Sequence, residues 1–105
     1  TSTPVGDVAE SNALHRVFGE DGPYVSATKS MTGHSLGAAG VQEAIYTLLM
    51  MEHGFVAPSI NITTRDPELP KINVAEKMIE TEISSAMSNS FGFGGTNGSV
   101  IFAKV

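Results

Sequence analysis

The first third of the chain carries one stripe of apolar residues at helical spacing. The stripe lies within residues 8–18 and predicts an amphipathic helix with one buried side. Asp7 stands directly before it and is a candidate for the N-cap, because its carboxylate accepts hydrogen bonds from the first backbone N–H groups of a helix. Residues 1–6 contain Pro4 and Gly6, so they are predicted to be extended or in a turn.

A second segment, residues 35–52, has apolar side chains around nearly its whole circumference. This pattern predicts a helix that is buried on most sides. His53 and Gly54 end it, because a basic side chain favours the negative C-terminal end of a helix and glycine adopts the left-handed conformation that follows. A chain of 105 residues cannot easily surround such a helix alone.

The remaining regular elements are predicted to be strands, which gives an α/β fold. Residues 24–28 form a short strand that leads into a polar loop, and residues 72–74 form an edge strand. The small side chains of residues 84–90 suit a strand that is buried on both faces. Residues 99–105 give the strongest strand pattern, and the glycine-rich segment 91–98 before them predicts a hairpin with this segment at its tip.

Composition narrows the possible partners. Only 16% of the residues are charged, which indicates that another surface covers part of this chain. The net charge of −5 and the scattered lysines and arginines argue against a nucleic-acid partner. The absence of cysteine excludes a disulfide framework, a thiolate metal site and a cysteine nucleophile within this chain.

The ends of the chain and its longest apolar run bear on its location. No signal peptide opens the sequence, and the apolar run at residues 44–51 is too short to span a bilayer. We therefore expect a cytoplasmic protein with no membrane partner. The sequence begins abruptly at Thr1 with residues typical of a loop, so we expect this start to be a cut in a longer chain.

Candidate chemistry concentrates in residues 27–40. Lys29 and His34 lie in a predicted loop that runs directly into the second helix. The first N–H groups of a helix are unpaired and carry a partial positive charge of about half a unit. Together with an Nε2–H donor from a neutral His34, they would stabilise an oxygen that becomes negative, such as an enolate. In the alternative interpretation, His34 packs beneath the helix and Lys29 is an ordinary solvated residue.

The surroundings of this loop add a carboxylate and several small residues. Glu43 lies within the apolar helix, where an unpaired buried carboxylate is costly, and Lys29 is its candidate partner; an exposed Glu43 is the alternative. Glycines leave room for close backbone approach, and hydroxyl side chains are available as helix caps. These residues are Gly33, Gly37, Gly40, Ser30, Thr32 and Ser35.

The segment 91–97, Phe-Gly-Phe-Gly-Gly-Thr-Asn, is a second candidate site. Its glycines allow the backbone to expose N–H groups, and the rings of Phe91 and Phe93 can close over a bound group. A phosphate-binding loop is the alternative, but no lysine follows and the Walker spacing is absent. No metal site is predicted.

Three motifs together resemble one family. Residues 1–7 (Thr-Ser-Thr-Pro-Val-Gly-Asp), residues 27–40 (Ala-Thr-Lys-Ser-Met-Thr-Gly-His-Ser-Leu-Gly-Ala-Ala-Gly) and residues 87–97 (Met-Ser-Asn-Ser-Phe-Gly-Phe-Gly-Gly-Thr-Asn) resemble, in order and spacing, the C-terminal quarter of the β-ketoacyl-[acyl-carrier-protein] synthases. The His-Ser-Leu after Gly33 resembles the synthase I type more than the synthase II type. Residues 1–105 would then be the C-terminal portion of an incomplete thiolase-like ketosynthase domain.

The resemblance implies a fold and an activity. The thiolase fold stacks two similar βαβ halves, and this chain would form most of the second half, with a mixed sheet, a buried central helix and covering helices. The activity is the decarboxylative Claisen condensation of fatty acid biosynthesis, in which a carbanion from malonyl-acyl carrier protein attacks an acyl group on a cysteine. The product is 3-oxoacyl-acyl carrier protein. No cofactor is implied beyond the phosphopantetheine of the carrier protein, and the complete enzyme is expected to be a homodimer.

The resemblance also assigns roles to residues. His34 matches the second catalytic histidine, which hydrogen-bonds the malonyl thioester carbonyl and stabilises the enolate. Lys29 matches the active-site lysine that supports this histidine, and Glu43 matches its carboxylate partner. Thr1 and Thr3 match the hydroxyls that hold the pantetheine arm.

The glycine-rich loop is assigned the other half of the site. Phe93 would contribute a backbone N–H to the oxyanion hole for the cysteine-bound acyl group. Phe91 matches the gating phenylalanine, and Gly92 lies between them.

Two residues of the family pattern are missing. The nucleophilic cysteine belongs far upstream, and the first histidine belongs to a His-Gly pair directly before Thr1. We therefore expect this chain to be inactive alone and to need an N-terminal portion that carries both residues. The alternatives are a non-catalytic thiolase-like subunit, against which Lys29 and His34 speak, and a free-standing binding domain, against which the apolar helix speaks.

Overall fold

The computed structural model describes residue 1 and residues 3–105, so Ser2 of the first motif lies outside the described residues. The chain divides into two compact units. One consists of residues 1–34 and 56–79, and the other consists of residues 35–55 and 80–105. Each unit has its own helices and its own backbone pairing.

The first unit begins with helix α1 (Pro4–Phe18). Thr3 is the N-cap, because its backbone is extended and its Oγ1 accepts a hydrogen bond of 3.1 Å from the backbone N–H of Gly6. Pro4 occupies the first helical position, where a missing N–H has no consequence for the helix. The prediction that the first six residues stay outside the helix and that Asp7 caps it is therefore wrong, since Thr3 and Pro4 start the helix one turn earlier.

The side chains of α1 are less buried than the apolar stripe predicts. Ser11 is the buried residue of this helix, whereas Val17 is 71% exposed. The helix ends at Phe18, where the predicted stripe also ends, and Gly19 follows it with a φ of 74°. The buried apolar residues of the first unit are Val56, Ile72 and Ala75.

The two strands predicted in the first unit are reduced to a single parallel bridge. Val25 pairs with Val74. The Val25 N–H donates to the Asn73 carbonyl at 2.8 Å, and the Val25 carbonyl accepts from the Ala75 N–H at 2.9 Å. The segments are extended as expected, but the pairing is too short to count as a strand.

The second unit contains the long helix α3 (Ala39–His53), preceded by the 3₁₀ turn Leu36–Ala38. The helix ends at Gly54, whose φ of 70° and ψ of 46° are left-handed, as predicted. Its start differs from the prediction because Ser35 does not cap it. The Ser35 hydroxyl instead donates to Oε1 of Gln42 at 2.6 Å.

An antiparallel hairpin completes the second unit. Strands β3 (Ser85–Gly92) and β4 (Thr96–Ala103) pair along their whole length, with Gly92 opposite Thr96. Gly94 and Gly95 turn the chain between them with φ values of 79° and 84°. The predicted hairpin is confirmed, with a shorter tip than expected. Two further short strands, β1 (Phe55–Val56) and β2 (Ile79–Glu80), pair with each other.

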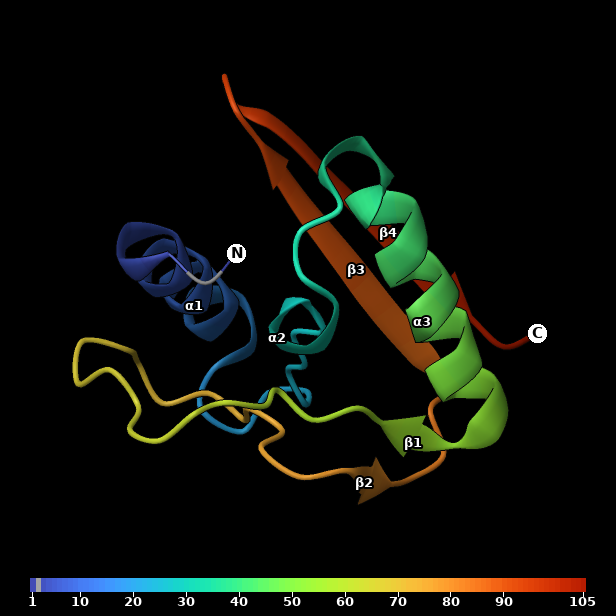
Figure 1. Cartoon of the computed structure of the whole chain (residues 1–105). Helices are drawn as coiled ribbons and strands as arrows, with labels where there is room; N and C mark the ends of the chain where they lie inside the picture. Colours follow the sequence, from blue (N-terminus) through green and yellow to red (C-terminus); the bar gives the residue numbers. More distant parts are fainter. Residues whose placement is uncertain (2) are drawn as a thin grey trace. The chain divides into compact units, whose positions relative to one another are not determined.

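Helix α3 packs on β3, and the two run side by side in Figure 1. A Cβ at Gly40 would lie 3.4 Å from the Ser90 hydroxyl, which shows how closely the helix approaches the strand. The buried residues of the helix are Ala39, Thr47 and Met51.

The opposite side of α3 is exposed. Val41 is 66%, Ile45 49% and Leu48 47% exposed, and these residues lie along one stripe at positions i, i+4 and i+7. This helix was predicted to be buried on most sides, and in this chain that prediction is wrong. The prediction that the strand at residues 84–90 is buried on both faces is also wrong for this chain. The second unit has one layer of helix and one layer of sheet, so each covers a single face of the other. Across the described residues, no helix is both long and apolar enough to cross a membrane.

Candidate functional site

Lys29 and His34 flank one helical turn of the first unit. Helix α2 (Lys29–Thr32) begins at Lys29, which is half-buried, and ends at Gly33, whose N–H donates to the Lys29 carbonyl at 2.9 Å. His34 follows Gly33 and is exposed. The prediction of a plain loop missed this turn, which is too short for a periodic pattern. The turn fixes the spacing of the lysine and the histidine through the backbone.

The hydroxyl groups around α2 were predicted to cap helices, but in the structure they make other hydrogen bonds. Ser30 Oγ donates to the Ala27 carbonyl at 3.2 Å and accepts from the Ile60 N–H at 3.1 Å. The Thr32 hydroxyl donates back to the Thr28 carbonyl at 3.2 Å. These side chains therefore stabilise the backbone on both sides of Lys29 through hydrogen bonds.

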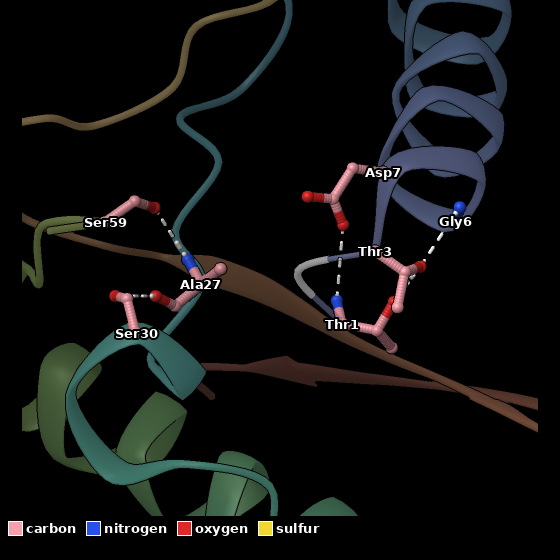
Figure 2. A network of polar contacts seen from close by, with 7 residues as sticks. All are labelled: Thr1, Thr3, Gly6, Asp7, Ala27, Ser30 and Ser59. Atoms are coloured by element: carbon pink, nitrogen blue, oxygen red, sulfur yellow. Dashed lines mark hydrogen bonds and ion pairs between the residues drawn. The ribbon is translucent and has the colours of Figure 1, made fainter. Parts of the chain in front are cut away.

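Thr1 and Thr3 form a separate small cluster in the first unit (Figure 2). Their hydroxyl oxygens lie 3.2 Å apart, and Thr3 Oγ1 also accepts from Gly6. The nitrogen of Thr1 lies 3.5 Å from Oδ1 of Asp7. A role of Thr3 in holding pantetheine stays a prediction, but its side chain already has a structural role as the helix cap.

The two roles of Thr3 lead to different expectations for two substitutions. Thr3→Ala removes the cap and is expected to lower the free energy of unfolding by about 1 kcal/mol. Thr3→Asp keeps a cap acceptor but loses the hydroxyl donor, so it should preserve stability and raise the KM for a pantetheine-borne substrate. Denaturant unfolding and steady-state kinetics of a full-length synthase that contains this chain measure both effects. An unchanged KM in Thr3→Asp would contradict the binding role.

The other predicted site residues lie in the second unit. Glu43 is half-buried on α3, and its carbonyl accepts from the Thr47 hydroxyl at 2.8 Å. Phe91 and Gly92 end β3, and Phe93 opens the turn with a fully exposed side chain. The pairing of Lys29 with Glu43 joins the two units and stays a prediction.

The part of the chain that the structure describes holds no group of three His, Cys, Asp or Glu residues suited to a metal ion. Sequence reasoning also missed Ser59 and Asn61, which contact the backbone around Lys29. Ser59 is only 8% exposed, and Asn61 is left-handed with a φ of 66°. Asparagine tolerates this conformation better than most residues, which is the one signal the sequence offered.

The chain matches the family described as Beta-ketoacyl synthase, C-terminal domain, over residues 1–63, which is more than half of its length. It belongs to the β-ketoacyl synthase family. Over 105 residues it is 59% identical to the 3-oxoacyl-[acyl-carrier-protein] synthase 1 of Escherichia coli K12, and the alignment covers all of this chain and 26% of that protein. This chain therefore spans about a quarter of the length of the curated relatives it matches.

Solved structures agree with this assignment. A β-ketoacyl synthase from Burkholderia phymatum superimposes with a TM-score of 0.93 at 43% identity, over 100% of this chain and 26% of the other. A type II polyketide ketosynthase, solved in complex with its acyl-carrier protein, gives a TM-score of 0.91 at 33% identity, over 99% and 26% of the two chains. The predicted family and the thiolase-like α/β fold are confirmed.

Proposed function

We propose that this chain supplies one part of the active site of a β-ketoacyl-[acyl-carrier-protein] synthase of fatty acid biosynthesis. The observation that carries the proposal is the match to the E. coli synthase along every residue of this chain. The complete enzyme would be an acyltransferase that condenses an enzyme-bound acyl group with malonyl-acyl carrier protein. The product would be 3-oxoacyl-acyl carrier protein.

His34 has the central role in this proposal. The bond between the malonyl methylene and its carboxylate breaks, carbon dioxide leaves, and the electron pair passes into an enolate of the thioester. A neutral His34 would donate its Nε2–H to the enolate oxygen, and a well-placed donor of this kind contributes about 3–4 kcal/mol. The exposure of His34 in this chain supports the role, because a side chain that meets a substrate must be accessible.

The other predicted residues would assist two steps. Lys29 would stabilise the negative charge near His34, and Glu43 would hold Lys29. The enolate carbon then attacks the acyl thioester, a carbon–carbon bond forms, and the N–H of Phe93 stabilises the oxyanion until the cysteine thiolate leaves. Phe91 would gate the acyl group, with Gly92 allowing the movement. The exposed rings and the left-handed glycines that follow them support a mobile hairpin tip.

The proposal assigns partners to the chain. One of the solved relatives was captured with its acyl-carrier protein, and we propose that this chain contributes to the same kind of complex, with Thr1 and Thr3 on the pantetheine arm. The nucleophilic cysteine and the first histidine would come from the rest of the synthase. A homodimeric assembly and a cytoplasmic location stay predictions.

A chimaeric synthase tests the proposal. In it, this chain replaces the equivalent segment of the E. coli synthase 1, which aligns with it over 105 residues. We expect the purified chimaera to convert acyl- and malonyl-acyl carrier protein into 3-oxoacyl-acyl carrier protein, and the 105-residue chain alone to be inactive. A folded chimaera that accepts the acyl group but never condenses it would contradict the proposal. That result would favour the non-catalytic subunit, which binds carrier protein or sets chain length.

A further inference from the structure

The backbone on both sides of Lys29 is held by a hydrogen-bond network that begins in the core of the first unit. Ala75, only 2% exposed, accepts a hydrogen bond of 2.7 Å on its carbonyl from the N–H of Ser59. The side chain of the buried Ser59 in turn accepts a hydrogen bond of 2.9 Å from the N–H of Ala27 (Figure 2). The backbone two residues before Lys29 is therefore tied to the most buried residue of the core.

A second set of contacts holds the backbone just after Lys29. Ser30 Oγ donates to the carbonyl of Ala27 at 3.2 Å, which closes a loop around Lys29 (Figure 2). The same oxygen accepts from the Ile60 N–H at 3.1 Å. The side-chain Nδ2 of Asn61 donates to the Ser30 carbonyl at 3.2 Å. A carbonyl in the last turn of a helix lacks an intrahelical partner, and Asn61 supplies one to α2.

The conformation of Asn61 is part of this arrangement. Its φ of 66° is left-handed, a conformation that is unfavourable for residues other than glycine, although less so for asparagine than for most. The conformation places the Asn61 amide on the carbonyl of Ser30. Residues held in this part of the Ramachandran plot persist when the surrounding structure fixes them.

We propose that Ser59, Ile60 and Asn61, here called the clasp, position Lys29 for the condensation. This inference rests on the proposed function, because it assumes that Lys29 takes part in the reaction. On the side of Lys29, the clasp contacts the backbone N–H of Ala27 and the hydroxyl and carbonyl of Ser30. Its proposed effect is to fix the backbone before and after Lys29, so its members are positioning residues and not catalytic ones. Displacing a reactive group by about 1 Å can slow a reaction by up to about 100-fold. Hydrogen bonds that set its backbone therefore affect the rate.

The chimaeric synthase allows the proposal to be tested. Asn61→Gly keeps the left-handed backbone accessible and deletes the amide, and Ser30→Ala deletes the hydroxyl that bridges Ala27 and Ile60. We expect each to lower kcat for condensation about 10-fold, with little change in KM or in acyl transfer to the cysteine. Ser30→Thr keeps a hydroxyl and should restore the rate.

Ser26 offers a matched control. Its hydroxyl donates to the Ala57 carbonyl at 2.6 Å, so it joins the same two segments of the first unit without contacting Ala27–Ser30. Ser26→Ala should lower the melting temperature about as much as Ser30→Ala and leave kcat unchanged. An equal loss of kcat in Ser26→Ala would show that general loosening, and not the position of Lys29, sets the rate, and it would overturn the proposal.

A double-mutant cycle separates this inference from the proposed function. If the clasp acts through Lys29, Asn61→Gly should have no further effect in a Lys29→Ala background. If Lys29→Ala slows condensation while Asn61→Gly changes nothing, or if the two losses simply add, the clasp proposal is wrong and the function stands. If Lys29→Ala leaves condensation unchanged, the role proposed for Lys29 fails, and the clasp proposal fails with it.

Discussion

His34→Ala in the chimaeric synthase is expected to slow condensation by about 10²–10³-fold. This is the loss that follows when one preorganised donor to a developing oxyanion is removed. The first half-reaction, transfer of the acyl group to the cysteine, does not involve the malonyl thioester and should proceed at the parental rate. Release of carbon dioxide from malonyl-acyl carrier protein measures the decarboxylation directly. Mass spectrometry of the acyl-enzyme measures the transfer of the acyl group to the cysteine.

Two further variants make the His34 result specific. His34→Gln places an amide N–H at a reach similar to that of the imidazole Nε2–H, so it should retain more activity than His34→Ala. His53→Ala removes an exposed imidazole at the C-terminal end of α3 and should leave condensation unchanged. Equal decarboxylation by the parental chimaera and by His34→Ala would remove His34 from the mechanism and favour the non-catalytic subunit.

Local signals in the sequence were sufficient for the end of α3 and for the β3–β4 hairpin of the second unit. Gly54 ends α3 in the left-handed conformation, and the small residues before the glycine-rich segment and the strand pattern of residues 99–105 after it predicted β3 and β4. Such signals depend on neighbouring residues, which the sequence displays. The start of α1 was within reach as well, because threonine followed by proline is a common N-cap and N1 pair. Pro4 disfavours the helical conformation only for the residue before it, and that residue, Thr3, is the extended N-cap.

The candidate site was predictable only where it lies in continuous motifs. Lys29 and His34 stand five residues apart in one motif, so the sequence presents them together. The clasp joins residues about thirty positions apart, through a serine hydroxyl, a backbone N–H and an asparagine amide. No local pattern predicts such contacts, because serine and asparagine are also common in surface turns that make no contact of this kind. These contacts to Ala27 and Ser30 depend on the fold of the first unit, which brings the two segments together.

Burial was the weakest prediction, for a physical reason. The apolar circumference of α3 correctly indicates that the helix suits an apolar environment on several sides, but it does not say which chain provides that environment. In this chain β3 covers one side and leaves Val41, Ile45 and Leu48 exposed. The low share of charged residues indicated the same need for another covering surface.

Ile45→Asp in the chimaeric synthase is therefore expected to destabilise the protein by about 3–5 kcal/mol, the effect of an unpaired charge in a buried site. The reason is that this chain spans 26% of its E. coli relative, and we expect the remaining part of the synthase to cover the exposed stripe of α3. Denaturant unfolding of the purified chimaera measures the change. If the stripe stayed in water, the same substitution would alter stability by only about 0.5 kcal/mol.

Two milder substitutions keep the test informative if Ile45→Asp does not fold. Ile45→Ala removes apolar volume without adding charge and should cost about 2–5 kcal/mol at a buried site. Ile45→Leu conserves volume and should cost less than about 1.5 kcal/mol. A large loss for alanine with a small loss for leucine means that the stripe is packed against the rest of the synthase. Near-equal, small losses for both would mean that α3 keeps an exposed apolar face in the complete enzyme, and the covering predicted here would be wrong.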